Sequence, residues 1–467
     1  MSQDASETGA AGGTLVIPGE MAARVDRLPM SFMAWEICMI VQVGWAIAAS
    51  TDGIASRMYP YVWLPAKEIT HTQYDVLYAF QVGISILIGA YALGWLADKI
   101  GRRKALILSA VLAGVFIWPF GYVTNYPALI VLSIADTLGF AGYLAINVVY
   151  MSEIMGPRVR PRVMMVSQVV CIFLLEVILT GLIPHWWFPS QYKAYLWLLA
   201  GLNIVVAVVL FFRMPESPRW LEARERRDQA RRIVEQMETR VKKRHPVLPE
   251  PDLSPHQVVA EEKTPWWAPF GRQYIVATIL LLIVMALGYG GIVYGGLSQA
   301  ALFISITRGY SAGFFFALYA WAGAAASAAY LINSFFGDRF ERKWTQLFGA
   351  ILFAGGWWGV YETHNTAALC TFFILSVVGA VLWLWSMYVY IPINYPTRMR
   401  SLGTGWTDGV GHLGAWGGVL IAGALFVATN PRNFVIFITI PCALVPGLLV
   451  AFFGKSQRRR TLEELAH

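Results

Sequence analysis

The chain is dominated by apolar runs of about 20 residues, separated by short charged or turn-forming segments. A helix needs about 20 mostly apolar residues to cross the hydrocarbon core of a bilayer. Only 14% of the residues are charged, whereas soluble domains carry about 25%. We therefore predict an all-α membrane protein with twelve transmembrane helices. Their ranges are 31–51, 73–96, 105–123, 127–152, 163–183, 194–213, 273–305, 311–336, 345–361, 367–393, 401–427 and 432–453.

A polar stretch separates the first six spans from the last six. Its first part has the charge pattern of a surface helix and its second part is rich in proline, so we interpret it as a linker. The N-terminal residues are rich in Gly, Ala and Ser, which predicts a disordered tail. The predicted units are a disordered cytoplasmic N-terminal tail (1–30), a six-helix bundle (31–213), a cytoplasmic linker with short surface helices (214–271), a second six-helix bundle (272–454) and a cytoplasmic C-terminal tail (455–467).

A short charged motif occurs twice, 240 residues apart. The first copy runs from Gly94 to Lys104 and the second from Gly337 to Lys343, which pairs Asp98 with Asp338. The same offset pairs Tyr150 with Tyr390 and Arg160 with Arg400. A repeat of this length in a membrane chain indicates two pseudo-symmetric halves with one solute path between them.

Positive charge is distributed unevenly between the two sides of the predicted membrane. Of the 36 Lys and Arg residues, 31 lie at the termini, in the linker or in the loops on the same side, and 5 lie on the other side. The positive-inside rule then places both termini and the linker in the cytoplasm. We expect a multi-pass protein of the plasma (inner) membrane.

Several function classes find no support in the sequence. The four cysteines lie in apolar runs without metal-ligand spacing, which argues against a metal site or a disulfide framework. Nucleotide-binding, zinc-hydrolase and serine-hydrolase motifs do not occur, which disfavours an ATP-driven pump or a membrane enzyme. We expect no cofactor, no metal and no nucleic-acid partner, and a monomer in the lipid bilayer.

The first copy of the repeated motif resembles the loop between helices two and three of the major facilitator superfamily. Tyr150 to Glu153 with Arg160, and the string from Pro215 to Leu221, are similar to motifs of its sugar porter, organic ion transporter and metabolite:proton symporter branch. In the second copy Ile393 stands where the branch has an acid, so the charge network there is expected to be incomplete. The resemblance implies a cytoplasmic gate formed by Gly94, Asp98, Gly101, Arg102, Arg103, Glu153, Arg160, Glu216, Arg219, Asp338, Arg342 and Arg400.

Acidic residues lie within the predicted spans, whereas no Lys or Arg lies in a span interior. A charge at a helix centre costs about 2.5–3.5 kcal/mol on insertion scales, so a functional role is the first hypothesis. Asp408 and His412 are spaced i,i+4, so they share a helix face and can pass a proton. The alternatives are structural hydrogen bonds, which we favour for Glu36 near a helix end. The candidates for proton coupling or substrate binding are Asp136, Glu176, Asp408, His412 and Glu36.

Polar and aromatic residues within the spans indicate a pocket for a small organic molecule. A glycine-rich stretch from Gly288 to Gly296 is expected to bend helix seven, since the resembled family bends this helix to gate the extracellular side. For each single residue, packing or an interfacial position is the competing interpretation. The candidate lining residues are Gln42, Gln81, Gln168, Tyr289, Tyr294, Gln299, Trp383, Trp385, Tyr388 and Asn394.

These features predict a secondary active transporter that moves a small organic solute by alternating access, coupled to proton symport. Intramembrane acids without bases favour a cationic or zwitterionic substrate, including an aromatic one. The alternatives are a proton symporter of organic, including aromatic, carboxylates, a facilitative uniporter, and a non-transporting membrane sensor on the same fold.

Overall fold

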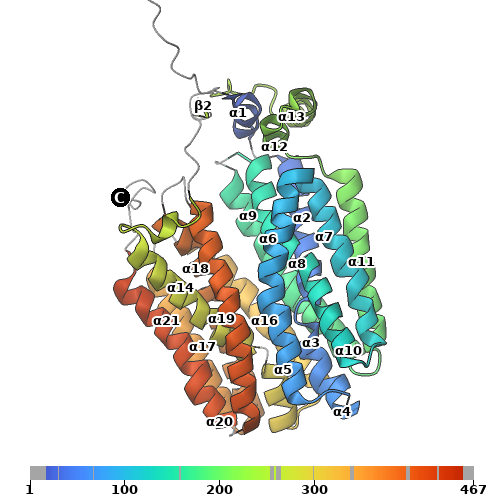
Figure 1. Cartoon of the computed structure of the whole chain (residues 1–467), viewed down its shortest axis with the longest axis vertical. Coiled ribbons are helices and arrows are strands. Elements are labelled where there is room, and N and C mark those ends of the chain that lie inside the picture. Colours follow the sequence, from blue (N-terminus) through green and yellow to red (C-terminus); the bar gives the residue numbers. More distant parts are fainter. Residues whose placement is uncertain are drawn as a thin grey trace, which may run out of the picture.

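The computed structural model describes residues 17–29, 31–66, 68–156, 159–252, 257–258, 265–297, 299–336, 341–395, 400–428 and 431–455. These residues form two helical bundles that lie side by side (Figure 1). Ten of their helices are long and apolar enough to cross a membrane. Two further long helices, α17 (Arg342–Glu362) and α19 (Arg400–Ala428), complete the predicted set of twelve. The predicted fold class is confirmed.

The N-terminal bundle contains the first six spans, several of which are divided into consecutive segments that include π-helical turns. In chain order the spans are α2 (Phe32–Thr51) with α3 (Ile54–Met58), η1 (Tyr59–Trp63) and α4 (Leu64–Ala66); α5 (His71–Ala79) with η2 (Phe80–Ser85) and α6 (Ile86–Ile100); α7 (Arg102–Ile117) with η3 (Trp118–Gly121); α8 (Tyr126–Ile154); α9 (Arg160–Ile172) with η4 (Phe173–Leu182) and α10 (Ile183–Trp187); and α11 (Tyr192–Arg213).

The C-terminal bundle repeats this arrangement. Its spans are α14 (Ile275–Gly288) with η7 (Tyr289–Gly296), α15 (Ala300–Leu302) and η8 (Phe303–Thr307); α16 (Ala312–Phe336); α17; α18 (Thr366–Tyr390) with η9 (Ile391–Asn394); α19; and α20 (Pro431–Phe434) with η11 (Val435–Thr439) and α21 (Ile440–Phe453).

Short polar side chains fix where several membrane helices begin. Thr70 and Gln73 form a capping box at the start of α5. Asn125 and Asn365 accept hydrogen bonds from backbone N–H groups in the first turns of α8 and α18, at 3.2 and 3.0 Å. These bonds satisfy N–H groups that have no partner within the helix. These helices therefore begin directly after polar residues that separate one apolar run from the next.

The first span is longer than predicted. It was expected to end at residue 51, but α3, η1 and α4 carry its helical path to Ala66 beyond a break at Asp52 and Gly53. Gly53 adopts a φ of 71°, in the left-handed region that glycine enters without steric cost. The break therefore redirects the helix and does not end it. Residues beyond the break, Arg57 among them, become part of the bundle.

The prediction of a disordered tail is wrong for its last part. Residues Glu20–Asp26 form α1, which lies against α12 (Pro218–Ala223) and α13 (Arg227–Lys242) at one end of the N-terminal bundle (Figure 1). Met21, Ala23 and Val25 are buried in that contact. The apolar side chains of this short segment gain a partner surface that composition alone does not reveal. Residues 1–16 lie outside the described residues.

The linker contributes α12, α13, a two-residue strand and a 3-10 turn. The strand β2 (Gln257–Val258) pairs antiparallel with β1 (Ile17–Pro18), and the turn η6 (Ala268–Phe270) precedes α14. The linker helices, α1 and the first motif lie at the same end of the N-terminal bundle, which we call the linker face (Figure 1). At the opposite end of the molecule lie α4 of the N-terminal bundle and α20 of the C-terminal bundle.

Besides the contact between the Glu176 carboxylate and the Tyr319 hydroxyl, four hydrogen bonds between described residues join the two bundles. Two of them lie toward the end opposite the linker face, where the Tyr61 hydroxyl meets Ser305 Oγ at 2.7 Å and His185 Nδ1 donates to the Gly313 carbonyl at 2.7 Å. The other two involve α5 and η2 of the second span. The bundles are therefore held together away from the linker face.

Candidate functional site

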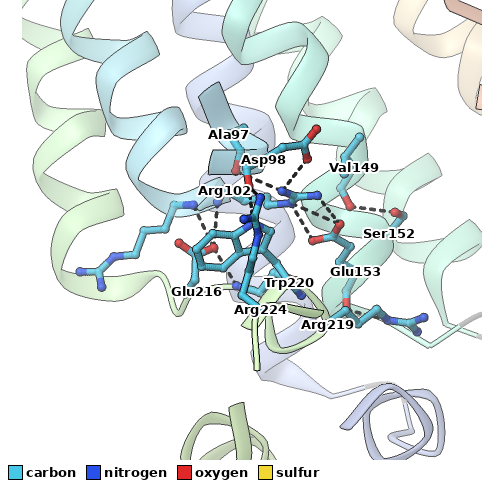
Figure 2. Close-up of polar contacts among 12 residues, drawn as sticks. Ala97, Asp98, Arg102, Val149, Ser152, Glu153, Glu216, Arg219, Trp220 and Arg224 are labelled. Carbon is cyan, nitrogen blue, oxygen red and sulfur yellow. Dashed lines mark hydrogen bonds and ion pairs between the residues drawn. The ribbon is translucent and has the colours of Figure 1, made fainter. Parts of the chain in front are cut away.

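A network of ion pairs occupies the linker face of the N-terminal bundle (Figure 2). Arg102 lies 2.8 Å from Asp98 and 3.0 Å from Glu153, so one guanidinium joins the end of α6 to the end of α8. The Arg102 side chain is 11% exposed and that of Glu153 is 17% exposed, which limits screening by water. The pairing fixes the relative position of two spans.

Glu216 lies at the N-terminus of α7. Its carboxylate accepts hydrogen bonds from the backbone N–H groups of Arg102 at 2.9 Å and Arg103 at 3.2 Å. Burial raises the pKa of Glu216, and these backbone hydrogen bonds oppose the shift. The close approach of the Glu216 carboxylate to α7 depends on Gly101, which has a φ of 104° and no side chain that would collide with the carboxylate. An anion at a helix N-terminus satisfies the free N–H groups there.

The segment after α11 folds back onto this motif. The Trp220 indole donates to the Asp98 carbonyl at 3.0 Å, and Arg224 donates to the same oxygen at 2.6 Å. Arg219 donates to the Glu153 carbonyl at 3.1 Å and pairs with Asp26 of α1. The N-terminal helix thus adds an acid to the network.

Most of the gate residues expected in the N-terminal half come together. Gly94 makes no close contact in this network, since a Cβ there would meet no atom within 4 Å. Arg103 donates to the Phe211 carbonyl. Arg342 begins α17. Asp338 and the side chains of Arg160 and Arg400 lie outside the described residues.

A base lies in the N-terminal bundle, contrary to the expectation that the membrane region contains none. Arg57 is 8% exposed and donates to the Ser50 carbonyl and the Tyr195 hydroxyl, both at 2.9 Å, and to the Asp52 carbonyl at 3.1 Å. The sequence interpretation placed Arg57 in a loop because the apolar run is interrupted at Asp52 and Gly53. The apolar residues that follow were the signal that the helix continues.

Two of the predicted acids have buried carboxylate oxygens. The Asp136 carboxylate is fully buried beside the Thr51 hydroxyl, and Asp52 and Arg57 lie within electrostatic range. Glu176 lies where η4 meets α16, close to Gly323 and facing Tyr319. A buried charge is costly, so both acids remain candidates for carrying a proton.

Glu36 has a different environment. It forms an ion pair with Arg213 at the end of α11, and the Arg213 side chain is 64% exposed. Glu36 is therefore not one of the unpaired acids, and its ion pair agrees with the structural role that the sequence favoured for it. The pair joins the first and sixth spans near the membrane surface.

The predicted Asp408 and His412 pair forms the centre of a polar cluster in the C-terminal bundle. The hydroxyls of Tyr289 and Tyr388 lie 3.1 and 3.0 Å from Asp408 Oδ1 and also lie within hydrogen-bond distance of each other. Each hydroxyl has one proton to donate, so the two hydroxyls alone supply donors for two of these three contacts. His412 Nε2 lies 3.9 Å from Asp408 Oδ2. The Asp408 side chain is 28% exposed, whereas His412 is 3% exposed. Tyr294 packs against both Tyr289 and His412.

The other ring nitrogen of His412 reaches the N-terminal bundle. Nδ1 lies 3.1 Å from the carbonyl oxygen of Val82 in η2. A carbonyl only accepts, so Nδ1 must carry a proton. In the neutral ring Nε2 is then an acceptor that faces the acceptor Oδ2 of Asp408. A proton on either group resolves this opposition, so the two groups form a natural proton site.

A further acid at the bundle interface was overlooked although it lies within the predicted span 73–96. Asp75 pairs with His71 at 2.8 Å and accepts from Gln299 at 3.5 Å. Its carboxylate lies against α19 at Gly423, where a Cβ would come within 2.0 Å of it. The spacing of His71 and Asp75, four residues apart, was the signal that could have identified the pair.

The remaining predicted lining residues divide between the two bundles. Gln42 bonds to Gln168 at 3.0 Å and to Asn147 at 3.2 Å within the N-terminal bundle. Gln81 is fully buried, and its amide has no hydrogen-bond partner among the described residues.

Three predicted lining residues in the C-terminal bundle make other contacts. Trp383 is fully buried against Gly288, so it is a packing residue. Trp385 lies against Tyr330 and Tyr388, and Asn394 donates to the Tyr390 carbonyl at 2.8 Å. A cluster of three or more His, Cys, Asp or Glu that could hold a metal ion does not occur among the described residues.

Two six-helix bundles joined by a linker, with buried charges near their contact, define a membrane transporter with two rocking halves. A family model described as Major Facilitator Superfamily matches residues 30–333. The chain belongs to the Major Facilitator Superfamily, as the first motif suggested. Its function class is therefore transport, and the family and the similar proteins are transporters, not enzymes.

Similar transporters align with most of the chain. The niacin transporter NiaP of Acinetobacter baylyi is 23% identical over 96% of this chain and 99% of its own length. The 4-hydroxybenzoate transporter PcaK of Pseudomonas aeruginosa is 26% identical over 79% of this chain and 81% of its own. The fold matches the partially occluded inward-open xylose transporter XylE from E. coli, with a TM-score of 0.70, 14% identity, and coverage of 92% of this chain and 100% of XylE.

Proposed function

We propose that this protein is a proton symporter of a small aromatic carboxylate, with Asp408 and His412 as the proton-binding pair. The proposal rests on one observation. Two hydrogen-bond acceptors, His412 Nε2 and Asp408 Oδ2, face each other 3.9 Å apart. Tyr289 and Tyr388 hold the other carboxylate oxygen, so Asp408 is positioned and partly open to a solute. The Tyr289, Tyr294 and Tyr388 rings offer an aromatic surface.

The same cluster explains why a carboxylate substrate would require a proton. Two carboxylates a few ångströms apart cannot both remain charged without a large repulsion, and they share a proton in such sites. A substrate carboxylate would therefore bind beside Asp408 only with a proton on the Asp408–His412 pair. Substrate and proton would then move together.

The hydrogen bond between His412 and the Val82 carbonyl would link proton binding to alternating access. Opening the contact between the bundles would break this bond, and a charged imidazolium would donate to the carbonyl more strongly than a neutral ring. Proton binding at His412 would then favour the arrangement in which these bundle surfaces touch. We place the linker face in the cytoplasm, because 31 of the 36 Lys and Arg residues belong to that side.

The substrate class rests on two observations. The relatives NiaP and PcaK are named for niacin and 4-hydroxybenzoate, which are both small aromatic acids. Arg57 removes the premise on which a cationic substrate was favoured, namely a membrane region without bases. A guanidinium in the N-terminal bundle makes the potential near the bundle interface less negative.

A cationic or zwitterionic aromatic substrate is the second candidate. It is favoured by the excess of acids in the spans, where Asp75, Asp136, Glu176 and Asp408 are accompanied by Arg57. An ammonium group could pair directly with Asp408 and lie over the tyrosine rings. In that case substrate and proton would compete for Asp408 and would not bind together.

Uptake into proteoliposomes separates these candidates. Nicotinate and nicotinamide form a matched pair, since they share the ring and differ in the carboxylate. We expect nicotinate or 4-hydroxybenzoate to accumulate when the outside is acidic, and a protonophore to abolish accumulation. Asp408→Asn should keep the tyrosine contacts, remove the titrating group and abolish accumulation. Uptake of amines in place of acids would support the second candidate, and uptake of acids that ignores the pH gradient would support a uniporter.

A further inference from the structure

An apolar groove lies between the two bundles on the membrane-facing surface. It has a volume of about 710 Å³ and is bounded by α6 and α19. Five residues of each helix line it at the same spacing of i, i+1, i+4, i+5 and i+8. They are Leu87, Ile88, Tyr91, Ala92 and Trp95 on α6, and Gly405, Trp406, Gly409, Val410 and Leu413 on α19.

Small residues create the groove and large ones form its rims. A Cβ on Gly405 would meet no atom within 4 Å, and one on Gly409 would lie 3.2 Å from Leu87. Tyr91 and Trp95 are 64% and 63% exposed, so their rings project outward beside the opening. Each lining stripe extends from i to i+8, and these eight steps cover about 12 Å along the helix axis at 1.5 Å per residue. An apolar slot of this length at membrane depth fits an extended hydrocarbon chain.

The groove ends in a positively charged and aromatic boundary at the linker face. Lys99 continues the α6 stripe one turn beyond Trp95, and its ammonium lies 5.5 Å from the centre of the Trp95 ring. Trp406 is held by a hydrogen bond from its indole to the Trp266 carbonyl at 2.9 Å. Trp and Lys at a helix end mark the depth of lipid headgroups. A molecule with its chain in the groove would place its polar end beside Lys99.

We propose that the groove binds one phospholipid with an anionic headgroup, with an acyl chain between α6 and α19 and the phosphate at Lys99. Lipid is the occupant because the groove opens at membrane depth and its only charged neighbour along the α6 stripe is a cation at headgroup level. Since α6 and α19 belong to different bundles, a bound chain would also separate the bundles at this level. The proposal does not depend on which solute is transported.

Native mass spectrometry of the purified full chain tests the site with phosphatidylglycerol and phosphatidylcholine as probes. Gly405→Leu fills the groove without meeting backbone. Gly417→Leu is the matched control, because Gly417 lies on the same helix outside the groove and also has no atom within 4 Å of a Cβ. We expect Gly405→Leu to weaken retention of one phosphatidylglycerol about tenfold, which corresponds to about 1.4 kcal/mol. Lys99→Gln should remove the preference for phosphatidylglycerol over phosphatidylcholine.

A second measurement keeps the proposal testable if Gly405→Leu folds poorly. Phosphatidylglycerol with a photoreactive acyl chain should crosslink the wild-type protein within 87–95 and 405–413. Crosslinks elsewhere, or equal lipid retention by wild type and a folded Gly405→Leu variant, would overturn the site. Equal binding of both lipids would overturn headgroup recognition. A dimer in the wild type that Gly405→Leu abolishes would assign the groove to a second copy of the chain.

Discussion

His412 Nδ1 donates to the Val82 carbonyl oxygen across the bundle interface, at 3.1 Å, while the Nε2 of the same ring faces Asp408. The two residues are 330 positions apart in the chain. One imidazole therefore contacts both a carboxylate of its own bundle and the backbone of the other bundle. In the proposed function, a change of protonation at this ring would therefore act on the contact between the halves.

His412→Ala should remove the link between protons and transport. We expect accumulation driven by a pH gradient to fall at least tenfold, whereas exchange of labelled for unlabelled substrate at equal pH persists in part. Both rates are measured in proteoliposomes. The matched control is His185→Ala, which also deletes a bond between an imidazole and a carbonyl across the interface, to Gly313. If both variants lose gradient-driven uptake equally, His412 acts only as a structural contact.

Gly83→Val should force the bundles apart near the centre of the interface. A Cβ at this position would lie 2.5 Å from Trp416 Cβ and 3.2 Å from the His412 carbonyl, and backbone atoms cannot rotate away. Overpacking of this kind costs about 1–3 kcal/mol, so the touching arrangement should become less populated. A cysteine introduced at Ser305, beside Tyr61, should therefore react faster with a thiol-specific label. Gly201→Val is the control, since a Cβ there meets no atom within 4 Å; unchanged labelling in both variants would contradict the prediction.

Arg102→Gln should destabilise the linker face. The substitution removes the ion pairs to Asp98 and Glu153 and leaves the carboxylate of Glu153, which is 17% exposed, without that guanidinium. Leaving a buried polar group unsatisfied costs about 1–3 kcal/mol, so the melting temperature of the purified protein should fall by several degrees. Arg231→Gln, at an exposed position of α13, is the control and should melt like the wild type. An Arg102→Gln variant that melts like the wild type would mean that the ion pairs add no net stability.

The attachment of α1 should weaken at acidic pH. Burial acts to raise the pKa of Glu238, but hydrogen bonds from Arg24 and Arg27 outweigh it and lower the pKa below its ordinary value. A lowered pKa contributes stability above the unfolded-state value, near 4.5, and that stability is lost as the pH falls through the folded-state value. Hydrogen exchange of residues 20–28, corrected for its intrinsic pH dependence, should therefore show greater opening below about pH 4.5.

Two substitutions in α13 test the attachment of α1 at neutral pH. Glu238→Gln should raise the exchange rate of residues 20–28 by about ten- to a hundredfold, as expected from losing a charge-assisted bond of about 1.5–3 kcal/mol. Glu235→Gln changes an exposed acid on the same helix and should leave the exchange nearly unchanged. Equal exchange in both variants would show that apolar contacts of α1 alone hold it in place.

The family resemblance predicted that Asp98, Arg102, Glu153 and Glu216 belong to one network, and the ion pairs and hydrogen bonds of the linker face join all four. Asp98 and Arg102 are one helical turn apart, and Gly101 allows the turn between them. Asp408 and His412 were identified from their spacing, since i,i+4 spacing places two side chains on one face. Trp383 was misassigned because an apolar helix can turn any of its faces to a neighbour, and only packing against Gly288 selects the buried one.

The sequence by itself determined the twelve spans, the duplicated halves and the motif at the linker face, because hydrophobic length and local spacing fix these features. Only the tertiary structure placed Arg57 inside the bundle, seated α1 on α12 and α13, and joined His412 to Val82. Each of these depends on a surface supplied by a distant segment. The free energy of such contacts comes from burial and hydrogen bonds between helices, for which no local pattern in the chain encodes the partner.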